Sequence, residues 1–382
     1  MTTNQVKPLR VAILGTRGIP ARYGGFETFA EQIATRLCAR GHRVLVYGRC
    51  SFFSRWGKRP NVNGVECRDT PTIFHKYLET PVHALTSFID MLFRRCDVML
   101  LCNAANSPLA PILRLKKAPL LINVDGIERN RAKWNSLGKL WYMLGERCSV
   151  RLASRVVSDA QVIADYYRET FGCDSVVIPY GVHPNPRPPG NTLDRFGLQP
   201  KRYILYVSRL EPENNALGVI QAYNETVKGQ SNPMPLVIVG DAPYATEYKA
   251  SLRQNACASV VFTGFQFGEA YEELQSNCYL YVQATEVGGT HPALIESMSY
   301  GNCVIANGTP ENREVVGDAA RCFSKNNFSE LAAILKELLT SPQQVQELGA
   351  RARGRVLETY SWDGVVSRYE ALFEQLTSQT PT

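Results

Sequence analysis

The stretch GTRGIPARYGG, residues 15–25, follows a short apolar strand at residues 11–14 and precedes a helix over residues 26–38. The helix is indicated by apolar residues that recur at intervals of three and four, and Gly41 follows its last turn. Glycines let the main chain come close to a ligand, and the amino terminus of a helix attracts anions. We therefore expect this loop to bind a ligand.

The loop differs from the G-x-G-x-x-G turn of dinucleotide-binding proteins. It is longer than that turn and contains Pro20. In dinucleotide-binding proteins an acidic residue at the end of the second strand binds the ribose. Here the second predicted strand, at residues 44–47, is followed by Gly48 and Arg49, so that acid is absent. A nicotinamide-dependent oxidoreductase is therefore the alternative and not the leading interpretation.

Composition favours a globular chain of two domains. The chain has 382 residues, of which 45% are hydrophobic and 20% are charged, and this length exceeds what one core usually supports. The 11 cysteines are scattered without a C-x-x-C pair, which suggests reduced thiols in a cytosol. No charged-then-apolar leader precedes residue 11, and no apolar run reaches the length of about 18 residues that a membrane-spanning helix needs.

Short apolar strands alternate with helical stretches, which is typical of doubly wound parallel sheets. In the first half we expect strands at residues 11–14, 44–47, 98–102, 120–124, 156–158 and 176–178. After a proline-rich run at residues 184–190, we expect strands at residues 203–207, 236–239, 260–262, 280–283 and 304–307. We therefore predict an α/β fold of two Rossmann-like doubly wound domains, residues 1–182 and 183–360, facing each other across a cleft.

Three strand-to-helix turns of the second half suit a phosphorylated ligand. Arg209 follows a predicted strand, and arginine can bind a diphosphate through two parallel hydrogen bonds; a surface ion pair is the alternative. Gly240 and Asp241 are a weaker signal after the next strand. At residues 288–291, GGTH, loop amides can cradle a phosphate. Glu296 lies one turn into an otherwise apolar helix and can accept hydrogen bonds from a ribose, or else face solvent.

A dense group of charges follows the predicted strand at residues 120–124. It reads DGIERNRAKW over residues 125–134, and charges at the end of a buried strand often line a cleft. Its candidate residues are Asp125, Arg131 and Lys133, and a structural ion-pair network is the alternative. A D-x-D pair is absent, and the five histidines share no metal-ligand spacing, so we expect no metal site.

Positive charge is concentrated in the first half. Residues 1–182 carry 26 Lys and Arg against 14 Asp and Glu, a balance of +12, whereas the remainder carries 16 against 21, a balance of −5. Cations lie beside aromatic or apolar runs at residues 52–59, 88–95 and 113–117, which suits an anionic membrane surface. The alternative is solvated charge beside core aromatics. No nucleic-acid-binding motif accompanies the charge, so we expect no nucleic-acid partner.

The string GTRGIPARYGGFETFAEQIATRL, residues 15–37, closely resembles the opening of the retaining family-4 glycosyltransferases, in particular a bacterial subgroup that includes polysaccharide rhamnosyltransferases. The DGIERNRAKW block resembles the subgroup's D-G-x-E-W-x-R-x-K-W signature, with Arg129 in place of the first tryptophan. The end of the chain resembles the family's closing helix, which crosses back onto the first domain; residues 361–382 are expected to form it. The resemblance implies a GT-B fold.

The resemblance also implies roles for single residues. Arg209 matches an arginine at the diphosphate, whereas Asn214 stands where the family usually has a lysine. Glu296 matches the acid at the ribose, and Gly288 stands where the wider family has an acid at the donor sugar. The expected catalytic residues are Asp125, Arg209 and His291; the donor-binding residues are Gly24, Gly25, Gly240, Asp241, Gly288, Gly289, Thr290 and Glu296; and the phosphate or acceptor contacts are Arg17, Arg131 and Lys133.

The function implied is retaining transfer of a hexosyl or 6-deoxyhexosyl group, such as L-rhamnosyl. The donor would be a nucleoside diphosphate sugar, dTDP-rhamnose or a UDP-sugar, with no cofactor and no metal. The acceptor would be a glycan or a polyprenyl-diphosphate-linked sugar in cell-surface polysaccharide synthesis, reached from the cytoplasm at the inner face of the plasma membrane. The alternatives are a sugar-nucleotide epimerase of the same fold, the oxidoreductase above, and a non-catalytic subunit of glycan assembly.

Overall fold

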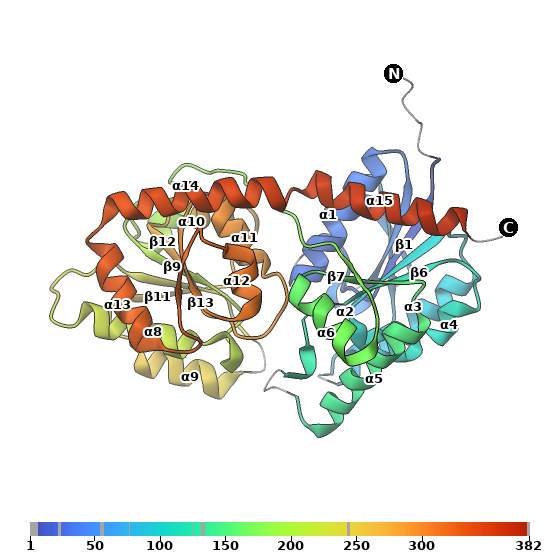
Figure 1. The fold of residues 1–382 in the computed structure, drawn as a ribbon, viewed down its shortest axis with the longest axis horizontal. Helices are drawn as coiled ribbons and strands as arrows, with labels where there is room; N and C mark the ends of the chain where they lie inside the picture. The colour runs from blue at the N-terminus through green and yellow to red at the C-terminus, as the bar shows by residue number, and fades with distance from the viewer. Residues whose placement is uncertain are drawn as a thin grey trace, which may run out of the picture. The chain divides into compact units, whose positions relative to one another are not determined.

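The computed structural model describes residues 7–21, 24–53, 57–75, 77–124, 126–130, 134–242 and 245–379 (Figure 1). Its elements form two compact units. Unit 1 comprises the chain up to Asn130, Trp134–Gly181 and the residues from Trp362 onward, and unit 2 comprises Val182–Ser361. The chain thus passes from unit 1 to unit 2 after Gly181 and returns after Ser361. The boundaries expected from sequence were after residues 182 and 360.

Unit 1 is built on an eight-stranded sheet in the order β3-β4-β2-β1-β5-β6-β7-β8. The strands are β1 (Arg10–Leu14), β2 (Arg43–Arg49), β3 (Gly57–Val62), β4 (Val65–Thr70), β5 (Val98–Cys102), β6 (Leu120–Val124), β7 (Arg155–Ser158) and β8 (Val176–Val177). All neighbouring strands are parallel except β3 and β4. The parallel core confirms the predicted α/β class.

The β3–β4 hairpin was not predicted. It closes through Asn63 and Gly64, which have φ angles of 48° and 85°, and two residues with positive φ make the tight turn that matches strand twist. The sequence of β3, GKRPNV, has no apolar run because the strand lies at the edge of the sheet and is largely exposed. Pro60 is tolerated there, since an edge strand can lose one ladder hydrogen bond.

Helices cover both faces of the unit 1 sheet (Figure 1). They are α1 (Gly25–Ala39), α2 (Cys50–Phe53), α3 (Glu79–Leu92), α4 (Pro111–Arg114), α5 (Ser136–Leu152), α6 (Gln161–Phe171) and α15 (Trp362–Ser378), with short 3-10 turns η1 (Ala104–Leu109) and η2 (Glu128–Asn130). Ala12 and Leu14 of β1 pack in one buried cluster with α3, α4 and α6. On the opposite face α1 and α15 contact each other, so unit 1 is doubly wound.

Unit 2 holds a six-stranded sheet, entirely parallel, in the order β11-β10-β9-β12-β13-β14. The strands are β9 (Ile204–Val207), β10 (Leu236–Val239), β11 (Val260–Gly264), β12 (Leu280–Gln283), β13 (Cys303–Asn307) and β14 (Arg321–Phe323). The helices are α7 (Asn191–Phe196), η3 (Pro212–Asn214), α8 (Ala216–Val227), α9 (Thr246–Asn255), α10 (Gly268–Asn277), α11 (Pro292–Ser299), α12 (Pro310–Val316), α13 (Phe328–Leu339) and α14 (Pro342–Thr359). Of the six strands, five were predicted from sequence, and the three-residue edge strand β14 was not.

The last helix, α15, is anchored in unit 1 by aromatic side chains. Trp362 is 6% exposed, and a Cβ atom at Gly181 would overlap its indole ring. The ring of Tyr369 lies 5.5 Å from that of Phe29 on α1, and the Tyr369 hydroxyl accepts a hydrogen bond of 2.7 Å from the side-chain amide of Asn123 on β6. In the part of the chain that is described, no helix is both long and apolar enough to cross a bilayer.

We predict that Tyr369→Phe destabilises unit 1 by about 1–3 kcal/mol, because the Asn123 amide would stay buried without this partner. All four tryptophans, at residues 56, 134, 141 and 362, belong to the sequence of unit 1. Tryptophan fluorescence during urea unfolding therefore reports on that unit. The control is Tyr223→Phe, which removes a buried hydroxyl of unit 2 that donates to the Met234 carbonyl. An equal fluorescence midpoint for Tyr369→Phe and wild type would contradict the prediction.

Candidate functional site

Three strand-to-helix turns of unit 2 open at the same edge of its sheet. The strands β10, β9 and β12 are adjacent and parallel, so their carboxyl ends lie side by side. Arg209 follows β9, Gly240 directly follows β10, and the GGTH segment at residues 288–291 follows β12. The structure therefore brings the predicted turns together at the edge where open parallel sheets bind ligands.

Arg209 is half-buried. Within the described residues, its guanidinium makes no hydrogen bond or ion pair, whereas its main chain is firmly held. The side-chain amide of Asn214 donates to the Arg209 carbonyl over 2.7 Å, and the Tyr206 hydroxyl donates to the Asn214 carbonyl over 2.6 Å. Asn214 is 3% exposed. It therefore positions the turn that carries Arg209, instead of supplying the cation that the family resemblance would place there.

Gly240 allows the turns after β9 and β10 to touch. Its φ angle is +130°, and a Cβ atom there would collide with the Ser208 carbonyl. The neighbouring Asp241 carboxylate has partners inside unit 2: it forms an ion pair of 2.7 Å with Lys249 and accepts a hydrogen bond of 2.7 Å from the Ala242 amide. Its partners give Asp241 a structural role in this turn.

Glu296 extends from α11 into a chain of hydrogen bonds. The Tyr271 hydroxyl donates to Glu296 Oε2 over 2.6 Å, and the Gln275 amide donates to that hydroxyl over 2.9 Å. Burial raises the pKa of Glu296 to about 7, against the opposing effect of the Tyr271 hydrogen bond. Near neutral pH this group therefore exchanges between a carboxylate and a neutral acid. Tyr271 and Gln275, both on α10, were not identified from sequence.

The segment between β12 and α11 shows why residue 288 is a glycine here, where the wider glycosyltransferase family has an acid. A Cβ atom at Gly288 would overlap the imidazole of His291, which precedes α11 as its N-cap residue. A side chain at residue 288 and the observed His291 ring therefore exclude each other. Gly289 and Thr290 are buried beside them. The nearby Glu286 carboxylate accepts a hydrogen bond of 2.8 Å from Asn326.

In unit 1, carboxylates of α1 hold the glycine-rich loop. Glu27 accepts a hydrogen bond of 2.9 Å from the Arg17 amide, and Glu31 accepts one of 2.8 Å from the Ala21 amide. The Arg17 side chain lies 3.7 Å from Glu79. Two loop amides and the Arg17 guanidinium thus have protein partners, none of which was predicted from sequence. Gly24 and Gly25 begin α1, as its N-cap and its first residue.

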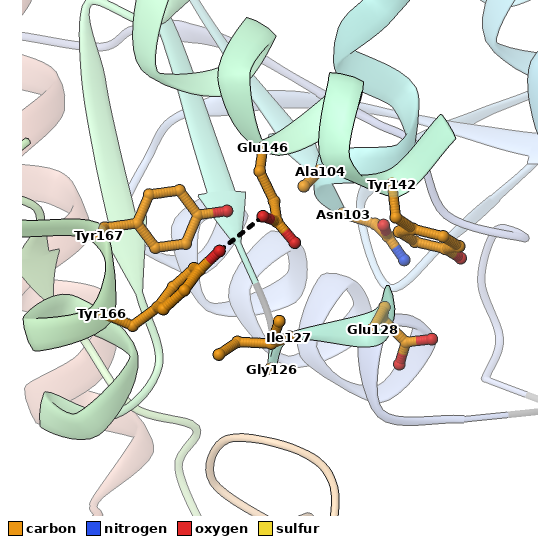
Figure 2. A pocket seen from close by; sticks show the side chains of 9 residues that line it. All are labelled: Asn103, Ala104, Gly126, Ile127, Glu128, Tyr142, Glu146, Tyr166 and Tyr167. Carbon is orange, nitrogen blue, oxygen red and sulfur yellow. Dashed lines mark hydrogen bonds between the residues drawn. The ribbon is translucent and has the colours of Figure 1, made fainter. Parts of the chain in front are cut away.

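The predicted charged block after β6 is described only in part: Asp125, Arg131 and Lys133 lie outside the described residues. Three of its described residues, 126–128, line a pocket at the carboxyl ends of β5 and β6 (Figure 2). The pocket is lined by Asn103, Ala104, Gly126, Ile127, Glu128, Tyr142, Glu146, Tyr166 and Tyr167. It combines carboxylates, hydroxyls and aromatic rings, the groups that hold polyhydroxylated ligands.

A buried acid lies at one end of this pocket. Figure 2 shows the Tyr166 hydroxyl directed at the carboxylate of Glu146, to which it donates a hydrogen bond of 2.8 Å. Glu146 is 4% exposed, and burial raises its pKa. Arg129 forms an ion pair of 3.3 Å with it and donates to Tyr166 over 2.6 Å. Glu146 was not identified from sequence. The feature that could have indicated it is that it is the only acid of α5 and has Gly145, Cys148 and Ser149 close by in the sequence GERCS.

Among the described residues, no group of three or more His, Cys, Asp or Glu side chains is arranged to hold a metal ion.

We predict that Tyr271→Phe moves the pH dependence of nucleotide binding upward by about one to two units. If Glu296 binds a ribose as a carboxylate, affinity for UDP or GDP rises as pH rises through about 7. The Tyr271 hydroxyl stabilises that charged form by about 1.5–3 kcal/mol, so its loss raises the pKa further. Calorimetric titration between pH 5.5 and 9 measures the shift, with Glu296→Gln as the variant without this titration. Coincident wild-type and Glu296→Gln profiles would remove Glu296 from the binding site.

Comparison with known proteins agrees with the geometry of both units. Residues 23–185 match the family described as Glycosyltransferase Family 4, and residues 194–355 match the family described as Glycosyl transferases group 1. The fold is similar to sucrose-phosphate synthase from Thermosynechococcus elongatus, with a TM-score of 0.82, 16% identity and coverage of 97% of this chain and 99% of that one. It is also similar to Anabaena HepE in complex with UDP and glucose, with a TM-score of 0.77, 17% identity and coverage of 97% and 100%.

Curated relatives match to different extents. A GDP-mannose-dependent α-(1-6)-phosphatidylinositol monomannoside mannosyltransferase of Mycolicibacterium smegmatis is 23% identical over 92% of this chain and 94% of its own length. The chain spans only 20% of a mannosyltransferase of Mycolicibacterium hassiacum, at 33% identity, and 42% of the α-monoglucosyldiacylglycerol synthase of Streptococcus pneumoniae, at 24% identity. Each unit thus matches one of two glycosyltransferase family models, and the fold of the chain is the two-domain GT-B fold.

Proposed function

We propose that this chain is a glycosyltransferase that moves a hexosyl group from a nucleoside diphosphate sugar to a glycan or lipid-linked acceptor in polysaccharide or glycolipid synthesis. The observation that carries the proposal is the arrangement in unit 2. A half-buried arginine without a partner among the described residues, two glycine turns and a partly charged Glu296 lie on consecutive elements at one edge of a parallel sheet. Such an edge suits a diphosphate and a ribose together.

The proposal gives mannosyl and glucosyl donors priority over the L-rhamnosyl donor expected from sequence. Of the proteins compared above, two are named as mannosyltransferases and one as an α-monoglucosyldiacylglycerol synthase, and the HepE structure contains UDP and glucose. Transfer of L-rhamnose from dTDP-rhamnose is the second donor reaction that we propose. It draws on Gly288, where a side chain that could bind donor hydroxyls is absent and the His291 ring occupies the space.

In the proposed reaction an acceptor hydroxyl oxygen bonds to the anomeric carbon while the bond from that carbon to the diphosphate breaks. The departing nucleoside diphosphate takes the acceptor proton, and retention at the anomeric carbon follows from the family resemblance. Arg209 stabilises the charge that develops on the diphosphate, Glu296 holds the ribose, and His291 contacts the sugar or a phosphate. The role of the protein is thus to orient the reactants and stabilise charge, and we propose that it needs no metal.

The acceptor belongs to unit 1 in this proposal. Its pocket with Glu146, Tyr166 and Glu128 supplies acceptors and donors for hydroxyl groups. Asp125, next to the pocket-lining Gly126 in sequence, is proposed to orient the reacting hydroxyl, and Arg131 and Lys133 to contact phosphates. A lipid-linked acceptor would bring the enzyme to the cytoplasmic face of a membrane, held there by reversible peripheral contact.

The function is tested by a donor screen. Thermal stabilisation is measured with GDP-mannose, UDP-glucose and dTDP-rhamnose, and the bound donor is then followed for release of its nucleoside diphosphate with and without a membrane lipid extract. Acceptor-dependent release supports the proposal. Conversion of the donor without release would instead indicate an epimerase, stabilisation by NAD(H) alone an oxidoreductase, and donor binding without any turnover a non-catalytic subunit.

Arg209→Ala is expected to lower kcat and kcat/KM together, by roughly 100- to 1,000-fold, because the interaction strengthens as the diphosphate departs. Steady-state kinetics with the donor found in the screen measure both constants. The matched control is Arg202→Ala, which removes an exposed arginine just before β9. A raised KM with unchanged kcat would mean that Arg209 binds the ground state and the transition state equally.

A further inference from the structure

Helix α3 carries an exposed apolar stripe along its outer side. The stripe consists of Leu78, Leu85, Ile89 and Phe93, which are 47%, 41%, 45% and 82% exposed. They recur at intervals of seven and four residues, so they lie on one face of the helix. The opposite face is buried, with Phe88 and Met91 at 0% exposure. The helix is therefore apolar on two sides, of which the sheet covers one.

Helix α5 repeats this pattern. Leu137, Leu140 and Leu144 are 75%, 56% and 45% exposed, and their spacing of three and four residues again places them on one face. The same face continues toward the end of the helix with Arg147 and Arg151, both exposed. The outer face of α5 is thus apolar in its first half and basic in its second.

The two stripes belong to one side of unit 1. Helices α3 and α5 both contact η1, and Figure 1 shows α3, α4 and α5 on the side of the sheet away from α1 and α15. Aromatic rings connect the start of α3 with α5. The ring centre of Tyr77 lies 6.2 Å from that of Trp134, and the ring centre of Trp134 lies 5.1 Å from that of Tyr142 on α5. At the other end Lys116 donates to the Leu92 carbonyl, which holds the exposed Leu115 near the end of α3. We name this surface, α3 to α5 with Leu115, the α3–α5 face.

Cations outnumber acids among the exposed charges of the α3–α5 face, where Asp97, beside Arg95, is an exposed acid that accepts a hydrogen bond from the Arg10 amide. Exposed cations without a hydrogen-bond or ion-pair partner among the described residues are Arg95, Arg114, Lys117, Arg147 and Arg151. Each acid of the three helices, all of whose residues are described, is paired: Glu79 with Arg49 at 2.9 Å, Asp90 with Arg68 at 2.7 Å, and Glu146 with Arg129 at 3.3 Å. A surface with apolar tips and uncompensated cations is complementary to a layer of acidic headgroups over hydrocarbon.

We propose that the α3–α5 face docks unit 1 onto an anionic lipid bilayer, with the leucine and phenylalanine tips inserted at the headgroup level. This inference gives a surface to the membrane contact of the proposed function and rests on it only for the lipid-linked nature of the acceptor. A protein partner fits less well, because the core of a protein interface is usually depleted of charged residues, whereas five cations without an ion-pair partner among the described residues accompany the apolar tips of this face.

The α3–α5 face keeps part of the membrane surface expected from sequence, namely Phe93, Arg95, Arg114, Leu115 and Lys117, and leaves out the rest. Arg59 forms an ion pair of 2.7 Å with the buried Asp69 and stacks 3.6 Å from the centre of the Phe53 ring, so it has a structural role. Phe88 is in the core, Arg94 pairs with Asp90, and Arg55 lies outside the described residues. The leucines of α5 were not anticipated at all.

The test uses the full chain and co-sedimentation with vesicles of phosphatidylcholine, with or without phosphatidylglycerol. Wild type should bind the anionic vesicles and release from them as salt is raised. Two double variants, Ile89→Gln with Phe93→Gln and Leu140→Gln with Leu144→Gln, should each lower the partition coefficient at least about tenfold. Replacing Arg95, Arg114, Lys117, Arg147 and Arg151 by glutamine should abolish the preference for phosphatidylglycerol.

Matched controls on unit 2 are Leu357→Gln, at an exposed leucine, and Lys228→Gln with Arg202→Gln, at exposed cations; both should bind like wild type. Equal partitioning of all variants, or none by wild type, overturns the inference. The inference is also overturned if light scattering shows that the wild type is a dimer and that the apolar variants are monomers which still bind vesicles. The α3–α5 face would then be the contact between two copies of the chain. Nucleotide-sugar binding in solution is measured in parallel, so a failure of the proposed function is distinguished from a failure of this surface.

Discussion

Parallel strand pairing is the constraint on which the rest of this structure depends. Because β10, β9 and β12 run in one direction and pair in register, every turn that leaves them must open at the same edge of the sheet. The strands are almost fully buried, so a slip in register would expose apolar side chains. The contact between Gly240 and the Ser208 carbonyl depends on the same pairing. The positions of Arg209 and of the glycine turn before α11 therefore follow first from the sheet, and Asn214 then holds the turn that carries Arg209.

Carboxylates take part in the candidate sites of both units, and each lies in a different environment. In unit 1, Glu27 and Glu31 receive main-chain amides and so shape the glycine-rich loop from its own helix. Glu146 is held by a cation and a hydroxyl, whereas Glu296 has a hydroxyl partner in Tyr271. A buried carboxylate needs such partners, since burial without them is costly. Burial in a mainly neutral setting is what brings the pKa of Glu296 close to neutrality.

The architecture also explains why α3 and α5 keep apolar outer faces. Both helices satisfy the core with one side, through residues such as Phe88 and Met91 on α3 and through close packing of Gly145 on Ala104 for α5. The glycine lets α5 approach η1, where Ser149 and Ser107 share a hydrogen bond of 2.8 Å. The outer leucines, by contrast, leave 41–75% of their surface exposed. Their presence beside unpaired cations is therefore more easily explained by an external partner than by folding.

The sequence by itself determined the α/β class, most of the parallel strands and the turns that carry the unit 2 site, because hydrophobic periodicity and glycine positions are local signals that survive in any context. The β3–β4 hairpin and β14 were not predicted, since β3 is largely exposed, β4 mixes apolar and charged residues, and β14 has only three residues. Only the tertiary structure decided which polar groups meet. The pairs Tyr271–Glu296, Arg129–Glu146 and Arg59–Asp69 join residues 25, 17 and 10 positions apart. Separations of this kind are set by how helices and strands pack, and composition or spacing along the chain contains no record of them.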